Sequence, residues 1–206
     1  MTEKDKMLAG MIYDPADDTL QHMRTCAHKL CNAYNKLDED DDERQVILSK
    51  LLPHGNGVYL QGPIYFDYGH FTTFGTNCYA NFNLTVLDCA PVTIGDNVFI
   101  GTGVSIVTPV HPLLPNERNM YVSDKGVLTD KEYAKPIVIG SNCWLASNVT
   151  VCGGVTIGDG CVIGAGSVVT RDIPSGVFAA GNPCRVIRKL TDADSIYLKK
   201  NLFPNK

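Results

Sequence analysis

The chain has 206 residues, of which 44% are hydrophobic and 19% charged, and its formal net charge is -4. This composition is typical of an ordinary globular protein, and the length suits one main domain with a small additional element. The acidic balance gives no sign of a nucleic-acid or membrane surface. No stretch approaches the roughly 18 continuous apolar residues of a membrane-spanning helix, and the opening MTEKDKMLAG lacks the apolar core of a signal peptide. We therefore expect a cytoplasmic protein with no nucleic-acid or membrane partner.

Residues 1–55 have the pattern of a helical cap. Thr2 and Asp5 are spaced as a capping pair ahead of a first short helix. Apolar side chains then recur at spacings of three and four, which predicts an amphipathic helix through Leu20, Met23, Ala27, Leu30, Tyr34 and Leu37. The acidic run 38–44 is predicted to be a solvated connector, and RQVILSKLL to form a third helix. Pro53 and Gly55 mark the end of this cap.

A six-residue repeat dominates the rest of the chain. Every sixth residue from Ile139 is aliphatic: Ile139, Leu145, Val151, Ile157, Ile163 and Val169. Four positions after each of these stands a small or apolar residue: Cys143, Val149, Val155, Cys161, Ser167 and Ile173. The same spacing fits Ile94, Ile100 and Ile106, and a looser version covers 68–86.

This period excludes the two commonest elements. An α-helix repeats its apolar positions at three and four, and a hairpin strand alternates every two. A strict period of six, with Gly, Asn and Asp between the aliphatic positions, predicts short strands joined by tight corners, all with one face inward. We therefore predict a mainly β fold, a parallel β-helix of hexapeptide units over 56–190, followed by a tail over 191–206.

The eight cysteines include no CxxC pair, and Cys78, Cys143 and Cys161 occupy one phase of the repeat. At that phase a cysteine is a small buried apolar side chain. We therefore expect eight reduced thiols rather than disulfides. No cluster of His and Cys has ligand spacing, so no metal site is expected.

One segment leaves the repeat. Residues 112–138 form a long insertion between two regular halves of the coil, and loops of this length in compact domains are usually functional. His111 stands at the root of the insertion. Imidazole is the side chain best suited to remove a proton near neutral pH, and the other four histidines lack such a setting. His111 is therefore the candidate catalytic base.

Three stretches carry a resemblance to a known family: YANFNLTVLD (79–88) followed by IGDNV and HP (111–112), the opening TEKDKMLAGMIYDPADDTL, and AAGNPCRVIRKL (179–190). Over essentially its whole length the chain resembles the maltose, galactoside and nodulation sugar O-acetyltransferases, and it is most similar to the maltose branch of these hexapeptide-repeat acyltransferases. The resemblance implies a left-handed, three-sided coil and a homotrimer with sites between subunits. It also implies acetyl-CoA as co-substrate and a sugar as acceptor.

The resemblance assigns three residues to the chemistry. His111 matches the general base that takes a proton from the sugar hydroxyl as that oxygen attacks acetyl-CoA, with no covalent intermediate on the enzyme. Asn81 matches a contact to the substrate and transition state, although an asparagine is also a typical turn residue at a coil corner. Glu132, four residues before Pro136, resembles an acid at the end of this loop in the maltose branch, and we expect it to orient or polarise His111.

The acceptor would be held by groups that accept hydrogen bonds from hydroxyls. The matching or neighbouring positions are Asp17, Asp67, Tyr79, Asn81 and Asp88. The chain departs from the galactoside branch at two places, because Asp67 replaces a serine and Cys89 replaces an acid. The acid expected near the N-terminus matches either Asp14 or Asp17. These differences leave the identity of the sugar open.

Coenzyme A needs cations for its phosphates and hydrogen-bonding groups for its pantetheine amides. By the resemblance, Ser147, Ala165 and Thr170 lie along the pantetheine arm. Arg171, Arg185 and Arg188 match the cationic positions near the nucleotide end, and guanidinium groups suit phosphate geometry. Arg188 taken alone is equally a solvated surface arginine. VIGAGSV is a coil turn rather than a nucleotide-binding loop, because no helix follows it.

Three alternatives stay open at this point. An enzyme of the same fold could acetylate an antibiotic or another hydroxyl compound. A zinc enzyme of the carbonic-anhydrase type would need three histidines around the metal, and only His70 and His111 lie in the coil region. A non-catalytic coil that serves as an assembly module would leave His111 without a chemical role.

Overall fold

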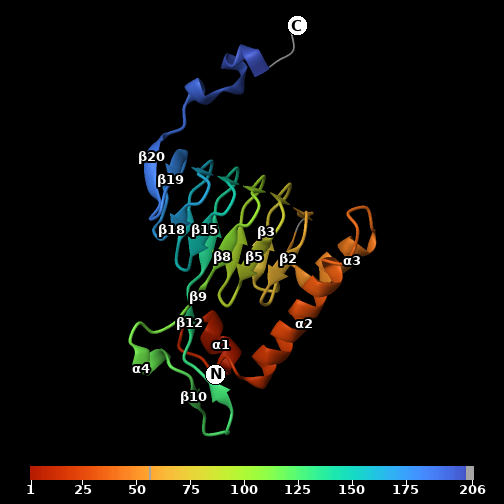
Figure 1. The fold of residues 1–206 in the computed structure, drawn as a ribbon, viewed down its shortest axis with the longest axis vertical. Helices are drawn as coiled ribbons and strands as arrows, with labels where there is room; N and C mark the ends of the chain where they lie inside the picture. Colours follow the sequence, from red (N-terminus) through yellow and green to blue (C-terminus); the bar gives the residue numbers. More distant parts are fainter. Residues whose placement is uncertain (56, 203–206) are drawn as a thin grey trace.

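Three parallel β-sheets form the faces of a coil that occupies the middle of the chain (Figure 1). The structure is a computed structural model that describes residues 1–55 and 57–202. The first face contains β1 (Tyr59–Leu60), β4 (Tyr79–Ala80), β7 (Phe99–Ile100), β14 (Trp144–Leu145), β17 (Val162–Ile163) and β19 (Val177–Ala180). The second contains β2 (Ile64–Phe66), β5 (Leu84–Leu87), β8 (Ser105–Val107), β15 (Thr150–Cys152) and β18 (Val168–Val169). The third contains β3 (Thr72–Phe74), β6 (Val92–Ile94), β13 (Ile137–Ile139) and β16 (Thr156–Ile157).

Consecutive strands go to the three faces in rotation, which is the path of a β-helix. The aliphatic residues of the repeat point inward: Ile139, Leu145, Val151, Ile157, Ile163 and Val169 are all at most 1% exposed. Asparagines at several corners adopt the left-handed backbone region, with φ of 59° at Asn142 and 58° at Asn148. Asparagine tolerates that region better than most residues. The predicted mainly β fold, a left-handed parallel β-helix with a helical cap and an inserted loop, is confirmed.

The coils are not all the same length. In the later coils Val151 pairs with Val169, eighteen positions on, as three hexapeptides require. In the earlier coils Val86 pairs with Ile106, twenty positions on. The extra residues explain why the repeat is looser before residue 112, and they widen a corner between the second and third faces.

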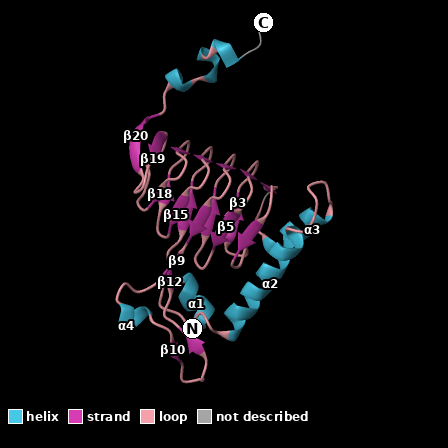
Figure 2. Cartoon of the chain, viewed as in Figure 1, coloured by secondary structure: helices cyan, strands magenta, loops and turns pink. Residues whose placement is uncertain are grey.

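The helices α2 (Asp18–Tyr34) and α3 (Glu43–Leu51) cover the N-terminal end of the coil, which would otherwise expose unpaired strand groups (Figure 2). The first helix, α1 (Glu3–Leu8), lies instead against α2 and β12 (Tyr133–Ala134). The capping pair Thr2 and Asp5 at the start of α1 is confirmed. Arg44, buried in α3, donates hydrogen bonds of 2.8 Å to the backbone oxygens of Leu60 and Gln61 at the first coil.

The insertion leaves the coil through β9 (Pro109–Val110) and returns through β12 (Tyr133–Ala134), and these two strands pair antiparallel. Between them lie α4 (Pro115–Arg118), β10 (Tyr121–Val122) and β11 (Leu128–Thr129). The segment between β8 and β13 is 108–136, so the insertion begins and ends slightly earlier than the predicted 112–138. Its base contacts the segment after α1, because the backbone N–H of Tyr13 donates to the oxygen of Glu132 at 3.0 Å.

The C-terminal end of the coil is covered by β20 (Arg185–Lys189), which pairs antiparallel with β19. The tail then leaves the coil as three short 3-10 turns, η1 (Asp192–Asp194), η2 (Ile196–Leu198) and η3 (Lys200–Leu202) (Figure 1). Residue 56, the predicted start of the coil, and 203–206, the end of the predicted tail, lie outside the described residues. Within the described part of the chain, every helix is too short or too polar to span a bilayer.

Candidate functional site

Successive coils stack their widened corners along one edge of the molecule. We call this edge the stacked corner; it consists of 67–71 between β2 and β3, 88–91 between β5 and β6, and 108–136 between β8 and β13. Backbone hydrogen bonds hold these corners in register, because the N–H of Asp67 donates to Val86 and that of Thr108 donates to Leu87. The fold therefore brings Asp67, Asp88 and His111, which are far apart in the sequence, to one edge.

Asp88 is fully buried within the stacked corner. Its carboxylate accepts hydrogen bonds from the backbone N–H groups of Tyr68 at 2.8 Å and of Gly69 and Phe71 at 3.2 Å, and from the Thr72 hydroxyl at 3.0 Å. Burial raises the pKa of this carboxyl, while the hydrogen bonds act in the opposite direction. Asp88 fixes the turn of the preceding coil and presents no oxygen to solvent, so the prediction that it contacts a sugar is wrong.

The two N-terminal acids have different roles. Asp17 is the N-cap of α2, and its carboxylate accepts from the backbone N–H groups of Thr19 and Leu20. Asp14 accepts a hydrogen bond from the hydroxyl of Thr129 in the insertion. Asp14 therefore reaches the base of the loop, whereas the carboxylate of Asp17 is engaged in capping its own helix.

Asp67 and Cys89, the two departures from the galactoside pattern, are in contact. The Sγ atom of Cys89 lies 3.8 Å from the Oδ2 atom of Asp67, and the other Asp67 oxygen lies 3.4 Å from Nε2 of His28. Cys89 is buried, and burial raises the pKa of its thiol with further contributions from Glu132 and Asp67. The thiol is therefore held in its neutral form beside the carboxylate.

His111 stands between two carboxylates of the insertion. Its Nδ1 atom lies 3.2 Å from an oxygen of Asp130, and its Nε2 atom lies 3.8 Å from an oxygen of Glu132. The ring is 44% exposed, so it remains accessible to a ligand. The structure thus brings predicted Glu132 to His111, and it adds Asp130, which the sequence did not single out.

Tyr13 connects this pair to the N-terminal segment. Its buried hydroxyl donates a hydrogen bond to the Oε1 atom of Glu132. Burial, together with neighbouring Cys89 and Glu132, raises the pKa of the Tyr13 phenol, so its hydroxyl stays protonated at neutral pH. A neutral donor thereby holds the carboxylate that faces the imidazole.

A single group of His, Cys, Asp and Glu side chains within the described residues has ligand atoms close enough for one cation, all within 4.8 Å: His111, Asp130 and Glu132. This donor set suits neither common class of metal site. Catalytic zinc is usually held by three protein ligands dominated by His and Cys, and calcium takes six to eight oxygens. The three-histidine zinc site therefore finds no support in the described residues.

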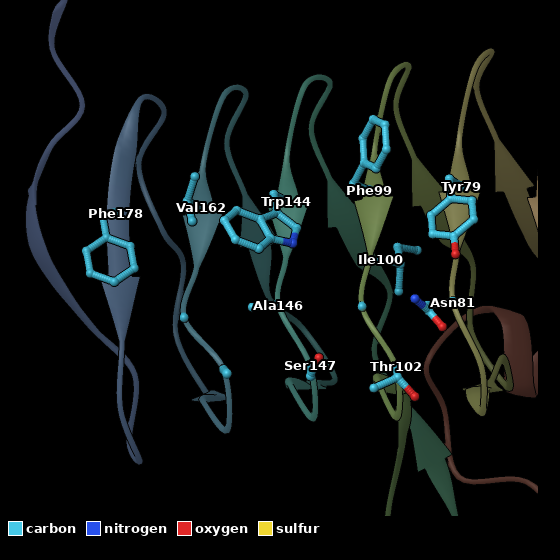
Figure 3. Close-up of a pocket in the computed structure, with 13 residues that line it drawn as sticks. Tyr79, Asn81, Phe99, Ile100, Thr102, Trp144, Ala146, Ser147, Val162 and Phe178 are labelled. Carbon is cyan, nitrogen blue, oxygen red and sulfur yellow. The ribbon is translucent and has the colours of Figure 1, made fainter. Parts of the chain in front are cut away.

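A groove of about 500 Å³ runs along the first face, on successive coils (Figure 3). Its residues are Tyr79, Asn81, Phe99, Ile100, Gly101, Thr102, Trp144, Ala146, Ser147, Val162, Gly164, Ala165 and Phe178. Aromatic side chains line it in a row, with the ring centroids of Tyr79 and Phe99 6.0 Å apart. Gly101 leaves the necessary room, because a Cβ atom there would lie 2.7 Å from the backbone nitrogen of Ser147. The result is an elongated, partly apolar channel.

The groove brings together residues predicted for two different ligands. Tyr79 and Asn81, expected near the acceptor, and Ser147 and Ala165, expected along the pantetheine arm, all line it. The predicted Thr170, Arg171, Arg185 and Arg188 do not line it, and all four are exposed. The Arg188 guanidinium nevertheless lies 6.0 Å from the ring of Phe178 at the end of the groove.

Sequence reasoning missed the aromatic wall of the groove. Phe99 and Trp144 stand at outward positions of their strands and are 56% and 52% exposed. Large aromatic residues at outward positions of a regular coil were the available signal, because a solvated face would carry polar residues there.

The candidate base and the groove are separate within one chain. Neither His111, Asp130 nor Glu132 lines the groove. The groove lies on the first face, and His111 lies at the corner between the second and third faces. A single chain therefore does not assemble His111, Asn81 and the channel into one described cavity.

Three sequence models of known families match the chain. A maltose acetyltransferase hexapeptide capping motif covers residues 6–56, a hexapeptide repeat of succinyl-transferase covers 91–111, and a bacterial transferase hexapeptide covers 136–171. The galactoside O-acetyltransferase of Escherichia coli K12 is 38% identical over 203 residues, which cover 98% of this chain and 96% of that protein.

Solved structures agree with these matches. A maltose O-acetyltransferase from Clostridium difficile 630 is 40% identical, with a TM-score of 0.84 over 93% of this chain and 99% of that one. A hexapeptide-repeat acetyltransferase from Vibrio cholerae, solved in complex with acetyl-CoA, is 34% identical with a TM-score of 0.81, over 93% of this chain and 100% of that one.

Proposed function

Because the chain belongs to the maltose and galactoside O-acetyltransferase family of hexapeptide-repeat proteins, we propose that it transfers the acetyl group of acetyl-CoA to a hydroxyl of a sugar. The observation that carries this proposal is the setting of His111, an accessible imidazole flanked by two carboxylates at the root of the insertion. A cytoplasmic location is part of the proposal, and the eight free cysteines support it.

The proposed step is direct transfer. The Nε2 atom of His111 takes the proton of the acceptor hydroxyl while that oxygen attacks the thioester carbonyl carbon. A carbon–oxygen bond forms, the carbon–sulfur bond breaks, and the imidazolium returns its proton to the departing CoA thiolate. The products are an acetylated sugar and free CoA. Orientation of both substrates supplies much of the rate enhancement.

Neighbouring residues have supporting roles in this scheme. The backbone oxygen of Lys131, 3.4 Å from Nδ1, and the carboxylate of Asp130, 3.2 Å from it, stabilise a proton on that nitrogen and so leave Nε2 free to act as base. Glu132 faces Nε2 without a hydrogen bond and stabilises the imidazolium that forms. The amide of Asn81 binds the substrate or the oxyanion of the transition state.

The groove is the proposed site of the pantetheine arm. Its length along successive coils and its mixed polar and apolar lining suit a long, partly apolar molecule. Ser147 and Ala165 line it, and Thr170 follows along the coil. Arg171, Arg185 and Arg188 supply positive charge for the phosphates at its far end.

We propose a homotrimer in which the base of one subunit meets the groove of the next. The separation of His111 from Asn81 within one chain supports this arrangement, because the proposed base and the proposed oxyanion contact must meet at one reaction centre. The insertion also exposes apolar side chains that a partner could cover, among them Leu113 at 88% and Val122 at 66%.

The test compares wild type with His111→Ala by thiol release from acetyl-CoA across glucose, maltose, galactosides and antibiotics that carry hydroxyl groups. We expect kcat to fall by roughly 10²–10⁴-fold in the variant, with unchanged acetyl-CoA binding and unchanged melting temperature. His22→Ala, an exposed histidine of α2, is the matched control.

Two results would decide against the sugar acetyltransferase. Transfer to antibiotics alone would identify the alternative acceptor class of the same fold. Absence of transfer to every acceptor by the wild type would leave a non-catalytic assembly role as the better account, whereas full transfer by His111→Ala would point to a different base.

A further inference from the structure

The first residues of the chain are fastened to the base of the insertion at two points. We call residues 3–14 the α1 segment; it consists of α1 and the residues that follow it as far as Asp14. The backbone N–H of Tyr13 donates to the oxygen of Glu132 at 3.0 Å, within an isolated antiparallel bridge. The hydroxyl of Thr129 donates to the carboxylate of Asp14. These partners are 119 and 115 positions apart in the sequence, so the fold alone unites them.

The two fastened residues of the insertion stand on either side of the groups that face the imidazole. Between Thr129 and Glu132 lie Asp130 and Lys131. Nδ1 of His111 lies 3.4 Å from the backbone oxygen of Lys131 and 3.2 Å from a carboxylate oxygen of Asp130. Fixing the residue before and the residue after restricts the backbone of the two between them. Both oxygens are thereby held opposite Nδ1.

Thr129 is oriented toward the α1 segment rather than toward solvent. It is 2% exposed, whereas Leu128, the preceding residue of β11, is 57% exposed. Successive side chains of a strand point to opposite sides, which places the Thr129 hydroxyl on the inner side. A buried hydroxyl without a hydrogen-bond partner would be unfavourable. The carboxylate of Asp14 therefore determines which side of β11 faces inward.

The α1 segment fixes Asp14 in turn. The backbone N–H of Asp14 donates to the carboxylate of Glu3 at 2.7 Å, and Glu3 forms an ion pair of 2.6 Å with Lys6. The carboxylate of Asp14 accepts a second hydrogen bond, from the backbone N–H of Ala16 at 2.9 Å. Met7 is fully buried and anchors α1 itself. The oxygen that receives the threonine hydroxyl thus has a defined place.

We propose that the α1 segment positions the imidazole base, and that Thr129 and Asp14 are its positioning residues. By fixing the backbone over 129–132 they keep the ring proton of His111 on Nδ1, so that Nε2 retains the lone pair that accepts the proton of the acceptor hydroxyl. This inference rests on the proposed function, because it assigns positioning residues to that reaction. It gives Asp14 a role that differs from contact with the acceptor.

A spectroscopic test measures the position of the ring proton without any substrate. Nitrogen NMR of the full chain, labelled with ¹⁵N-histidine, distinguishes a protonated from an unprotonated ring nitrogen, and His111→Ala identifies the signals of this ring. We expect Nδ1 to be the protonated nitrogen of the neutral ring in wild type. Thr129→Val removes the hydroxyl at nearly constant volume, and it should give a mixture of both tautomers. Thr129→Ser should restore the wild-type signals, and Thr93→Val, the same change at an exposed position of β6, is the control.

A kinetic test applies the same variants to sugar acetylation. In Thr129→Val we expect kcat to fall roughly 3- to 10-fold, the effect of losing one hydrogen bond, while the KM for acetyl-CoA stays unchanged. Thr129→Ser should recover kcat. Asp14→Ala should behave like Thr129→Val in both tests, whereas Asp14→Asn keeps the accepting oxygen and should resemble wild type. If Thr129→Val does not fold, the two Asp14 variants provide the same comparison.

The two readouts separate failure of this inference from failure of the proposed function. Wild-type ring signals in both Thr129→Val and Asp14→Ala would overturn the positioning role, even if kcat fell. A higher KM for the sugar in Asp14→Ala, with wild-type ring signals, would make Asp14 a contact of the acceptor instead. Mixed tautomers in both variants of a protein that acetylates no sugar would refute the proposed function and leave the positioning of His111 in place.

Discussion

His111 is held in a setting that gives its two ring nitrogens different tasks. The hydrogen-bond partner of Nδ1 is the backbone oxygen of Lys131 at 3.4 Å, and a carboxylate oxygen of Asp130 lies 3.2 Å from the same nitrogen, whereas Glu132 stands 3.8 Å from Nε2. Two oxygens at Nδ1 favour the proton on that side, so in the proposed reaction Nε2 keeps the lone pair that accepts a proton from the substrate. Nε2 stays free for the substrate only if Glu132 does not bind it, and the hydroxyl of Tyr13 donates a hydrogen bond to Glu132. In the proposed reaction we therefore expect Tyr13 to be a positioning residue that acts through Glu132.

Replacing Tyr13 by phenylalanine should lower kcat for sugar acetylation roughly 3- to 10-fold, because one hydrogen bond to Glu132 is lost without loss of ring volume. The KM for acetyl-CoA should not change. Steady-state kinetics with Tyr121→Phe, an exposed tyrosine of the same insertion, provides the control. Equal kcat values for Tyr13→Phe and Glu132→Gln would support the idea that Tyr13 affects catalysis through Glu132. An unaffected kcat in Tyr13→Phe would refute the role of its hydroxyl.

At the scale of elements, an acid of the C-terminal tail forms an ion pair with Arg188, one of the arginines expected to bind the phosphates of coenzyme A. Both terminal guanidinium nitrogens of Arg188, in β20, donate to the carboxylate of Asp194 in η1, at 2.8 and 2.6 Å. The hydrogen bond from Arg188 is the largest cause that lowers the pKa of Asp194, from 3.8 to about 2. The contribution of the pair to stability is thus present above pH 3.8 and lost as the pH falls through about 2, so the pair is intact in neutral assays.

Asp194→Asn should therefore lower the KM for acetyl-CoA roughly two- to five-fold, because it frees Arg188 to bind a phosphate without competition from a carboxylate. The expected change is modest because the pair is exposed to solvent. Asp192→Asn, in the same short turn, is the charge-matched control. Acetyl-CoA titrations at low and high salt check the mechanism, since the difference between the two variants should shrink as salt screens the phosphates. A KM that rises in Asp194→Asn would mean that the pair itself helps to build the site.

The coil elements were predictable and the corner contacts were not, for a physical reason. Whether Ile139 or Val151 points inward depends on its own place in a local period, so a linear pattern contains that information. The burial of Asp88 depends on N–H groups of a corner twenty residues earlier, and the position of Asp130 depends on how the insertion folds back on β9. No local pattern encodes contacts of that kind. The resemblance identified His111 and Asn81 as candidates. The structure was needed to show that they lie at different places on one chain, Asn81 in the groove and His111 outside it.

At the scale of the whole molecule, two incomplete surfaces face outward. The groove contains Asn81 and exposed aromatic residues but not His111, whereas His111, the proposed base, and exposed apolar residues lie at the insertion, which does not line the groove. Exposed apolar patches of this kind mark interaction surfaces. Repetition of one chain around a closed axis would join the insertion of each copy to the groove of its neighbour, which is a heterologous interface that forms a ring.

Mixing two inactive variants tests this arrangement directly. His111→Ala lacks the base and Asn81→Ala lacks the amide, so each homotrimer should be inactive or nearly so. After joint unfolding and refolding, mixed trimers should contain sites in which an intact His111 of one subunit meets an intact Asn81 of the next. With random assembly, about a quarter of the interfaces are of that kind, and the mixture should recover up to that share of wild-type activity. Analytical ultracentrifugation before and after mixing confirms the assembly, and unmixed proteins taken through the same refolding are the control. A mixture that forms trimers but stays as inactive as its components would contradict the shared site, because a site built within one subunit cannot be restored by its neighbour.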